Sequence, residues 1–551
     1  MYCIKKFFCI MLSALFIISS MPFVAFAAKV NNVTYYIDAL NGDNSNSGTS
    51  EAEAWKDLGG FTGEQVLTAG VSVLFKCGGT YDFNVELKDI IGTKEKPFVI
   101  SSYGKGERPI LTTQAKDEIL TLIDCSYITI SNLQMVAPNG GGIWIDTLER
   151  TSEGITIDNV YFHNMPNGKV NARDDMANGA ASARAAVMVK GLPARSRYAV
   201  NDLTIKNCEV YNCANGFMIW GSWNDEQNPW CEEKDADPIY NTGLLIEGCY
   251  FHEMDAEAVI VGICDDALVT NCRAINTCQG EGVDENGEIL YFTAAMWFWG
   301  SENSTIEYCE IAGQKNFGDG MSVDFDSCTN NCTYQYIYSH DNMRFMCNNA
   351  KESPQKNNTV RYCLSVNDNG GRSAIASGNG EDGFKFYNNT IINCADFHVR
   401  YLTNSFVANN IIMPEEGYII YFNRQEEKVA GNTYTNNCYA YTMKPSIDSD
   451  SLNIVPNFVG GEDATTAYQL AEGSVLIGAG VKMEDDLSVD FFGNEITESN
   501  IGCYGGSGEK ATDDTKNTEN ETIIEKLIRL IKTAFATLKK EFYKLIEDTD
   551  E

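Results

Sequence analysis

The chain of 551 residues contains few basic side chains, few histidines and few prolines. Lys and Arg number 41 against 76 Asp and Glu, which gives a formal net charge of −35. Nucleic-acid binding depends on clustered Lys and Arg that neutralise phosphates, so this composition argues against a nucleic-acid partner. Four histidines leave little room for a metal site rich in histidine.

Long apolar runs are also scarce, and the single clear one lies at the N-terminus, from Phe7 to Phe26. Lys5 and Lys6 precede this run, and Ala25-Phe26-Ala27 gives the small-x-small pattern at which signal peptides are cleaved. We therefore predict that residues 1–28 are a secretory signal and that the protein is secreted, with an uncleaved membrane anchor as the alternative. No other stretch is long and apolar enough to cross a bilayer.

The composition favours strands and turns. Apolar residues make up 44% of the chain, which is enough for one large core, and Asn, Gly, Thr, Tyr and Val are abundant. A short frame, apolar-x-(Asn/Gly/Tyr)-Cys, recurs at Cys208, Cys249, Cys272, Cys309 and Cys363. Further segments fit the frame with another residue in place of Cys, namely at Leu133, Val160, Ile337, Asn389 and Asn410. The interval is 21–28 residues with three longer gaps, which is typical of a solenoid with loop insertions.

The residues of the repeats decide which solenoid is expected. The repeats lack a leucine lattice and a helical period, and their apolar residues are β-branched or aromatic. We predict an all-β fold, a right-handed parallel β-helix of about ten or more coils with three short strands each. The aligned cysteines are then expected to form an interior ladder of thiols, since Cys packs as a small apolar residue. Cys231, Cys278, Cys328 and Cys332 lie outside the frame and are expected to allow disulfides.

The composition changes along the chain and predicts six parts. They are a signal peptide (1–28), an N-terminal cap segment (34–115), the coils (116–445), the end of the β-helix domain (446–506), a polar linker (507–520) and an amphipathic helix (521–548). The apolar residues of the last part recur at helical spacing, and six Lys and Arg make it locally basic. Such a helix is expected to pack on the protein, to mediate self-association, or to associate with the cell envelope.

One resemblance rests on the segment before the coils. YYIDALNGDNSNSGTSEAEAW, then VLFKCGGTY, then GTKEKPFVISSYGKGERPIL are similar to the start of bacterial secreted β-helix proteins of the carbohydrate-active group, which includes glycoside hydrolases and pectate-lyase-like proteins. The similarity continues more loosely to about Gly506. It implies a β-helix fold, export and a polysaccharide or oligosaccharide as partner. It does not choose the reaction, because the group includes hydrolases, lyases and adhesion proteins.

The second strand of each coil predicts an outward face, because side chains alternate between core and exterior along a strand. We aligned three of these strands at their last residues, namely AMWFW, GMSVD and RFMCN. The alignment predicts that Trp299, Asp324 and Asn348 lie side by side. The predicted substrate-binding residues are Trp220, Trp297, Trp299, Asn348 and Arg400. Tryptophans on an exterior face are expected either to be covered by the neighbouring loops or to stack on sugar rings in a groove.

GDGMSVDFDS is the strongest catalytic candidate. Asp324 and Asp326 are two residues apart on one strand, so both are expected to point outward, roughly 6.5–7 Å apart. Two carboxylates that flank a bond are what glycoside hydrolysis requires. His340 in the turn YSHDN is a third catalytic candidate, although the equivalent His163 and His252 favour a structural role. No cofactor is required, but Asp319, Asp324 and Asp326 are also oxygen ligands suited to calcium.

Two other functions remain open at this point. A polysaccharide lyase, assisted by calcium, needs a cation to neutralise a uronate, and Lys190, Arg344, Arg372 and Arg400 are available. A non-catalytic glycan-binding protein would keep the tryptophans without needing the carboxylates. The sequence favours a secreted glycoside hydrolase that degrades polysaccharide.

Overall fold

The protein is described from a computed structural model. It describes residues 32–63, 65–166, 184–189, 198–223, 238–280, 293–315, 320–350, 355–371, 373–375, 377–378, 381–415, 418, 420–422, 431–442, 445–484 and 487–511. The predicted signal peptide and the predicted C-terminal helix lie outside these residues, as do most of the predicted linker, Asp319, Lys190, Cys231 and Arg372. Within the described residues, no helix is long and apolar enough to cross a membrane.

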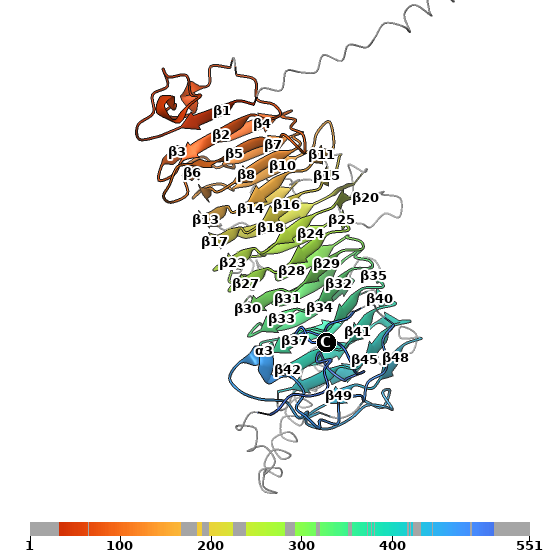
Figure 1. The fold of residues 1–551 in the computed structure, drawn as a ribbon. Coiled ribbons are helices and arrows are strands. Elements are labelled where there is room, and N and C mark those ends of the chain that lie inside the picture. The colour runs from red at the N-terminus through yellow and green to blue at the C-terminus, as the bar shows by residue number, and fades with distance from the viewer. Residues whose placement is uncertain are drawn as a thin grey trace, which may run out of the picture.

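Three long parallel sheets, named A, B and C here, form the walls of a solenoid (Figure 1). They contain 14, 13 and 10 strands, and the strands that pair are not consecutive in the chain. The chain passes through A, B and C in turn and then pairs each strand with its counterpart in the next coil. β8, β9 and β10, for example, pair with β12, β13 and β14. The predicted all-β parallel β-helix with ten or more coils is confirmed.

The described elements have the following bounds. Sheet A contains β1 (Thr34–Ile37), β2 (Ser72–Lys76), β5 (Phe98–Tyr103), β8 (Ile128–Ser131), β12 (Thr156–Asp158), β16 (Thr204–Lys206), β22 (Leu245–Glu247), β26 (Leu268–Thr270), β29 (Thr305–Glu307), β32 (Thr333–Gln335), β36 (Thr359–Arg361), β41 (Lys385–Tyr387), β45 (Phe406–Ala408) and β48 (Thr433–Thr435). Sheet B contains β3 (Thr80–Asp82), β6 (Ile110–Thr112), β9 (Gln134–Val136), β13 (Tyr161–Met165), β17 (Glu209–Cys213), β23 (Tyr250–His252), β27 (Arg273–Ile275), β30 (Glu310–Ala312), β33 (Tyr338–His340), β37 (Leu364–Val366), β42 (Thr390–Cys394), β46 (Ile411–Pro414) and β49 (Cys438–Tyr439). Sheet C contains β4 (Val85–Lys88), β7 (Leu120–Ile123), β10 (Ile143–Asp146), β14 (Ala185–Val189), β18 (Asn215–Trp220), β24 (Val259–Gly262), β28 (Ala294–Trp299), β31 (Met321–Asp326), β34 (Arg344–Ala350) and β39 (Ser377–Gly378).

Short sheets and helices occupy the corners and ends. The short sheets are β11 (Ser152–Glu153) with β15 (Val200–Asn201), β19 (Ser222–Trp223) with β20 (Pro238–Ile239), β21 (Asn241–Thr242) with β25 (Cys264–Asp265), then β35 (Gln355–Lys356), β40 (Glu381–Asp382) and β44 (Leu402–Thr403), and last β38 (Ser373–Ile375), β43 (Phe397–Val399) and β47 (Ile420–Phe422). The helices are η1 (Glu51–Glu53), η2 (Leu58–Gly60) and α3 (Ala464–Ala467).

The interior is built from columns of like residues stacked across coils. In sheet A the register places one apolar residue per strand at the same interior level. This column begins with Ile130, Ile157, Ile205, Ile246, Val269 and Ile306, all fully buried. Burying such a side chain stabilises the fold by about 1.5–3 kcal/mol, so each repeat contributes to one continuous core.

Asparagines form the corners between sheets A and B. Asn132, Asn159 and Asn207 have φ values of 57°, 54° and 53°, in the left-handed region that asparagine tolerates better than most residues. Their amides also join neighbouring coils, because Asn159 Nδ2 donates to Asn132 Oδ1 at 2.8 Å. The repeated frame in the sequence therefore marks the corner between sheets A and B, where one residue must take a positive φ.

The predicted interior thiol ladder is confirmed. Its five members are thiols with at most 2% of their surface exposed: Cys208, Cys249, Cys272, Cys309 and Cys363. In later coils asparagines take over the position, and Asn389 Oδ1 accepts from the Cys363 backbone N–H at 3.0 Å. Cys278, Cys328 and Cys332 are thiols as well, so the expectation of disulfides at these three positions is wrong.

The chain after β49 doubles back over the outer face of sheet B. Leu364, Ile392 and Ile411 on that face pack against Leu476 and Ile501 of the returning segment. The final coils are therefore covered on this side by the segment that follows them, and the last described residues lie beside the solenoid.

The thiols give the first testable prediction. Of 16 described cysteines, Cys77, Cys328 and Cys347 are partly exposed and the other 13 are buried. An alkylating reagent should therefore modify only these three in the native protein, and all 16 after denaturation without reductant. Peptide mass spectrometry gives the count, and ladder cysteines that stay unmodified after denaturation would show that they are disulfide-bonded.

Candidate functional site

The outer face of sheet C brings the candidate residues together. Phe298 of β28 and Phe325 of β31 pair with each other and point into the core, so the residues that alternate with them point outward. The strand register then defines two outward columns. The first runs through Trp144, Met188, Met218, Ile260, Trp297, Asp324 and Cys347, and the second through Trp220, Gly262, Trp299 and Asp326.

Asp324 and Asp326 lie on the same outer face of β31, but their surroundings differ. Asp324 is 7% exposed and Asp326 is half-buried. The Ser327 backbone N–H donates to Asp326 Oδ1 at 2.7 Å. On the inner side, the Tyr334 hydroxyl donates to the Asp324 carbonyl at 2.6 Å. Burial, with the nearby charge of Asp324, raises the pKa of Tyr334 well above its usual value, so this phenol remains a donor that holds the strand.

The neighbours predicted for Asp324 are wrong. The register pairs Asp324 with Trp297 on one side and with Cys347 on the other, instead of Trp299 and Asn348. β31 is displaced by two residues relative to the sequence alignment, which keeps both aspartates outward. β34 is displaced by one residue, and a shift of one turns every side chain to the opposite face. Cys347 was missed for this reason, since RFMCN carries no signal that fixes its register.

Asn348 is consequently an interior residue and does not face a substrate. It is fully buried, beside Phe325, and its amide contacts the carboxyl group of Glu381. The Asn358 backbone N–H donates to the other oxygen of Glu381 at 3.0 Å, and Gln355 Nε2 donates to the Phe325 carbonyl at 2.8 Å. Burial raises the pKa of Glu381 to about 8, so this carboxyl is protonated in the folded protein at neutral pH. A polar corner therefore lies directly beneath the strand that carries the aspartates.

The three predicted tryptophans form one cluster, but they are not equally accessible. Trp220 packs edge-on against Trp297 and Trp299, with ring centroids 6.3 Å and 5.7 Å apart. Trp220 and Trp297 are partly exposed, whereas Trp299 is 4% exposed and packs with Ile263. This burial favours the alternative in which Trp299 is covered by its neighbours, and its role in sugar binding stays a prediction. Trp297 is the indole beside Asp324.

Gly262 makes this cluster possible. A Cβ atom at this position would lie 2.3 Å from the Trp220 ring, so the indole crosses the strand where a side chain would stand. Among the described residues, no acceptor meets the buried indole N–H of Trp220 or of Trp297. Packing, rather than hydrogen bonding, holds these two rings in place.

His340 does not join the aspartates. It lies on β33 in sheet B, stacks on Tyr338 with centroids 4.4 Å apart, and contacts Asp341 and Glu310. His163 and His252 make the same stack with Tyr161 and Tyr250 on other coils. Burial opposes protonation of His340, but its hydrogen bonds to Glu310 and Asp341 raise its pKa. These contacts favour the structural role, and the catalytic role of His340 stays a prediction.

Arg400 is also remote from the aspartates. It follows β43, which lies three coils beyond β31, a distance of about 14 Å at the usual strand spacing. Its guanidinium contacts the ring of His398. Arg344 lies on β34, the strand next to β31, where it pairs with Met321. Lys190 and Arg372, the other cations considered for a lyase, lie outside the described residues.

The calcium interpretation stays a prediction. Within the part of the chain that the structure describes, no three His, Cys, Asp or Glu side chains converge on a potential metal position. Asp319 was one of the three proposed ligands, and it lies outside that part.

Much of the outer face of sheet C is buried although it points away from the core. Met218, Ile260 and Asn215 are fully buried, and Glu257 is 6% exposed. Glu257 lies between Ala256 and Ala258, just before β24. This part of the outer face is therefore covered, whereas Trp220, Trp297 and Asp326 on the same face are partly exposed.

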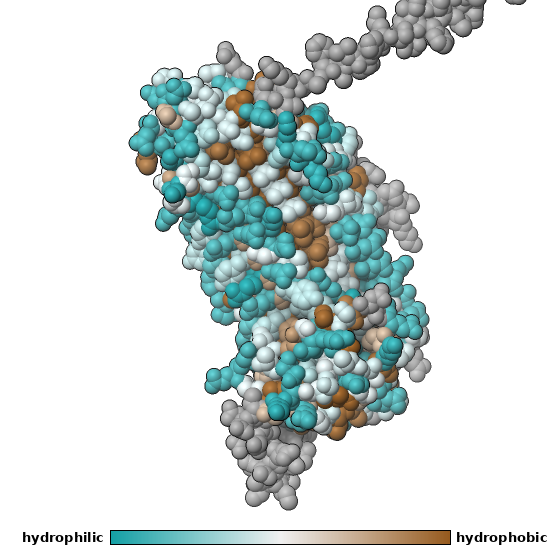
Figure 2. Space-filling model, viewed as in Figure 1, coloured by the Kyte–Doolittle hydropathy of each residue, from teal (hydrophilic) through white to brown (hydrophobic). Residues whose placement is uncertain are grey.

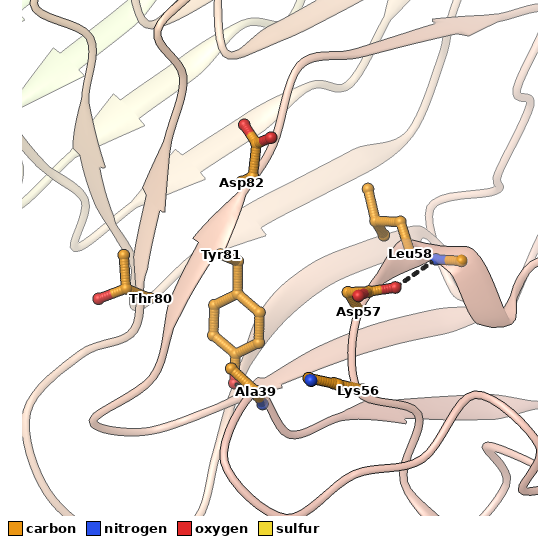
Figure 3. Close-up of a pocket in the computed structure, with 8 residues that line it drawn as sticks. Ala39, Lys56, Asp57, Leu58, Thr80, Tyr81 and Asp82 are labelled. Carbon is orange, nitrogen blue, oxygen red and sulfur yellow. Dashed lines mark hydrogen bonds between the residues drawn. The ribbon is translucent and has the colours of Figure 1, made fainter.

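A pocket of about 430 Å³ lies elsewhere, at the N-terminal end of the solenoid (Figure 3). It is lined by Ala39, Lys56, Asp57, Leu58, Gly59, Thr80, Tyr81 and Asp82. The Tyr81 hydroxyl donates to the Ile37 and Lys76 carbonyls, and the Asp57 carboxylate accepts from Asn44 and Gly59, which lowers its pKa. These hydrogen bonds stabilise local turns. The two carboxylates that line the pocket, Asp57 and Asp82, come from different segments of the chain.

The buried carboxyl of Glu381 gives a prediction about stability. Its folded pKa of about 8 lies above the usual value of 4.5, so its contribution to stability is complete below pH 4.5 and is lost as pH rises toward 8. Glu381→Gln keeps the shape and removes the titration. The variant should gain stability relative to the parent as pH rises from 5 to 8, by about 1.4 kcal/mol per pH unit at most.

Denaturant unfolding at several pH values measures this difference. The exposed Glu107→Gln is the matched control and should leave the pH dependence unchanged. Parallel curves for Glu381→Gln and the parent would contradict a protonated, buried Glu381.

The tryptophan cluster gives a second prediction. Trp299→Ala removes a buried ring and should cost about 3–5 kcal/mol, whereas Trp297→Ala removes a partly exposed ring and should cost clearly less. Thermal melts of the two variants, measured side by side, test the order. Equal losses would show that both rings are core residues.

Comparison with known proteins agrees with the resemblance noted in the sequence. No model of a known protein family matches the chain. The chain is 26% identical over 583 aligned residues to lacto-N-biosidase of Bifidobacterium longum subsp. longum, an alignment that covers 85% of the chain and 36% of that protein. The chain thus spans about a third of the length of this curated relative. Among solved structures, GH136 lacto-N-biosidase from Eubacterium ramulus is 18% identical, with a TM-score of 0.49 over 77% of this chain and 67% of that one. Pectate lyase Pel9A is 12% identical, with a TM-score of 0.40 over 87% and 96%.

Proposed function

We propose that the protein is a secreted glycoside hydrolase whose active site lies on the outer face of sheet C, at β31. The observation that carries this proposal is the pair Asp324 and Asp326 on one face of one strand, with Trp297 beside Asp324. Glycoside hydrolysis requires two carboxyl groups and a surface that binds the sugar. An indole ring offers an apolar plate to the C–H face of a sugar, and Trp297 supplies it at the carboxylates.

The surroundings of the two aspartates suggest their roles. Asp326 accepts a hydrogen bond from the Ser327 backbone, which suits the ionised partner that attacks the sugar or activates water. Asp324 is more deeply buried, which suits the partner that delivers a proton to the leaving oxygen. Their separation of roughly 6.5–7 Å along the strand lies between the retaining and inverting ranges, so it does not choose the stereochemistry.

The substrate is proposed to be an oligosaccharide that contains lacto-N-biose. The relative from Bifidobacterium longum is a lacto-N-biosidase by name, which supports a short sugar unit as the group released. The buried outer face supports the same conclusion, because an enclosed site accepts the end of a glycan more readily than the middle of a long chain. The signal-peptide pattern in the sequence supports export to the medium or the cell surface.

Replacement of Asp324 tests the proposal. Asp324→Asn keeps the shape and removes the ionisable group, so turnover of a chromogenic lacto-N-bioside should fall by at least ~10²-fold, with little change in affinity. Trp297→Ala should mainly raise KM, because it removes a contact made in both the ground state and the transition state. Asp146→Asn, an outward carboxylate five coils away on β10, is the matched control and should retain normal turnover.

Three outcomes would contradict the proposal. Normal turnover by Asp324→Asn would exclude this aspartate from the reaction. Products that absorb at 235 nm would identify a lyase. Glycan binding without turnover across an oligosaccharide panel would identify a binding protein.

A further inference from the structure

Buried polar atoms without hydrogen-bond partners gather at two nearby strands of sheet C. Asn215 begins β18 and is fully buried, and its Oδ1 atom meets no donor in the described chain. Thr293 directly precedes β28 and is 4% exposed, and its Oγ1 atom also has no partner there. The buried indole N–H groups of Trp220 and Trp297 meet no acceptor among the described residues. Buried polar groups of native proteins are nearly always hydrogen-bonded, so this concentration of unpaired atoms points to a missing partner.

The four residues stand at the corners of one area of sheet C, called the orphan frame here. β24 lies between β18 and β28, so these two strands are about 10 Å apart (Figure 1). Asn215 and Trp220 lie five residues apart, about 16 Å along the strand. Thr293 and Trp297 lie four residues apart, about 13 Å. An area of this size accommodates a disaccharide.

The middle of the orphan frame is apolar. Met218 pairs with Ile260, and Ile260 pairs with Trp297. The two aliphatic side chains are fully buried, whereas Trp297 is partly exposed. Figure 2 shows that apolar patches also interrupt the hydrophilic surface of the solenoid. An apolar floor with polar atoms at its edges matches a sugar, whose ring carries C–H groups on its faces and hydroxyl groups around its edge.

The polar groups of the orphan frame favour a neutral ligand that donates hydrogen bonds. Glu257 is 6% exposed and lies beside Asn215, since the Gly216 N–H of β18 donates to the Glu257 carbonyl at 2.8 Å. Its carboxyl group and Asn215 Oδ1 both accept hydrogen bonds from hydroxyl groups. An ionised carboxylate in a covered site repels a second carboxylate, so a uronate is disfavoured.

The orphan frame ends at the proposed catalytic residues. Trp297 pairs with Asp324 on the next strand. Asn215 lies three strands before Asp324, at least about 14 Å away across the sheet. A sugar unit at Asn215 is therefore not the unit whose bond is cleaved at Asp324, but a unit beyond it.

We propose that the orphan frame holds the disaccharide that the enzyme releases, and that Asn215 and Thr293 bind hydroxyl groups of the sugar unit farther from Asp324. This inference rests on the proposed function and adds the residues that select the substrate. The sugar hydroxyls supply the partners that the buried atoms lack, so binding satisfies groups that are otherwise unpaired. A single sugar at Asp324 would not reach them, so the site selects glycans that end in a disaccharide of neutral sugars.

Removal of the Thr293 hydroxyl tests the inference. Thr293→Val keeps the shape and removes a group that has no partner in the described chain, so Tm should stay equal to that of the parent or rise. The Kd for free lacto-N-biose, measured by calorimetry, should rise at least about fivefold, because a sugar hydroxyl loses its partner. Thr390→Val is the matched control. That buried hydroxyl accepts from the Cys503 N–H at 3.0 Å, so its loss should lower Tm and leave Kd unchanged.

Asn215→Leu gives a second measurement. It removes Oδ1 together with the amide that donates to the Arg184 carbonyl at 3.1 Å, so Kd should rise and Tm should fall. In both variants KM for the chromogenic lacto-N-bioside should rise with little change in kcat, because the contacts are made in the ground state and the transition state alike.

The outcomes separate this inference from the proposed function. Unchanged Kd in both variants, with normal turnover by the parent, would overturn the inference alone. A lower Tm with unchanged Kd in Thr293→Val would show a structural hydroxyl and would overturn it as well. A parent that neither binds nor hydrolyses any glycan of the panel would overturn the proposed function, and the inference with it.

Discussion

The structure depends on one constraint, the in-register pairing of each strand with its equivalent in the next coil. Parallel pairing at about 4.8 Å per coil stacks each residue on its counterpart, so a position must suit the same column in every coil. Ile157 between Ile130 and Ile205 shows the apolar form of this rule, and Asn159 on Asn132 shows the polar form at a corner. The core, the corners and the outer columns are all consequences of this pairing.

This constraint explains why the fold could be predicted from the sequence. A column of stacked residues gives the sequence a periodic pattern. The cysteine frame could be recognised because Cys208, Cys249 and Cys272 occupy the same interior position in different coils. Loop insertions lengthen the interval without breaking the stack, so the frame survived gaps of more than forty residues. The replacement of Cys363 by Asn389 at the same position of a later coil could also be recognised from the sequence. A buried asparagine is accepted there because its side-chain oxygen accepts a hydrogen bond from the backbone N–H of the preceding coil.

The candidate site was only partly predictable. It depends on which alternate residues of a short strand face outward, and a register error of one residue reverses that assignment. Asp324 and Asp326 were assigned to the outer face correctly, since Val323 and Phe325, which alternate with them along the strand, are apolar. Asn348 was misplaced because a polar residue looked like an exterior one. The interior can accept it only because Glu381 and Gln355, distant in sequence, form a polar corner there. The residues of RFMCN do not by themselves indicate that polar corner. Without it, the register of this strand, and with it the residue that lies beside Asp324, could not be predicted.

Buried polar networks hold both ends of the strand that carries the aspartates. At its start, the Ser339 hydroxyl donates to Asp368, whose burial raises its pKa, and the Ser322 and Ser339 hydroxyls share a hydrogen bond at 2.8 Å. Beyond its centre, Gln355 bonds the Phe325 carbonyl. Such networks fix a geometry more tightly than apolar packing, because a displaced partner leaves a buried group unsatisfied. Elsewhere sheet C stacks mainly aliphatic and aromatic residues on its inner side, so the rigid polar corners coincide with the coil that carries the two carboxylates of the proposed site.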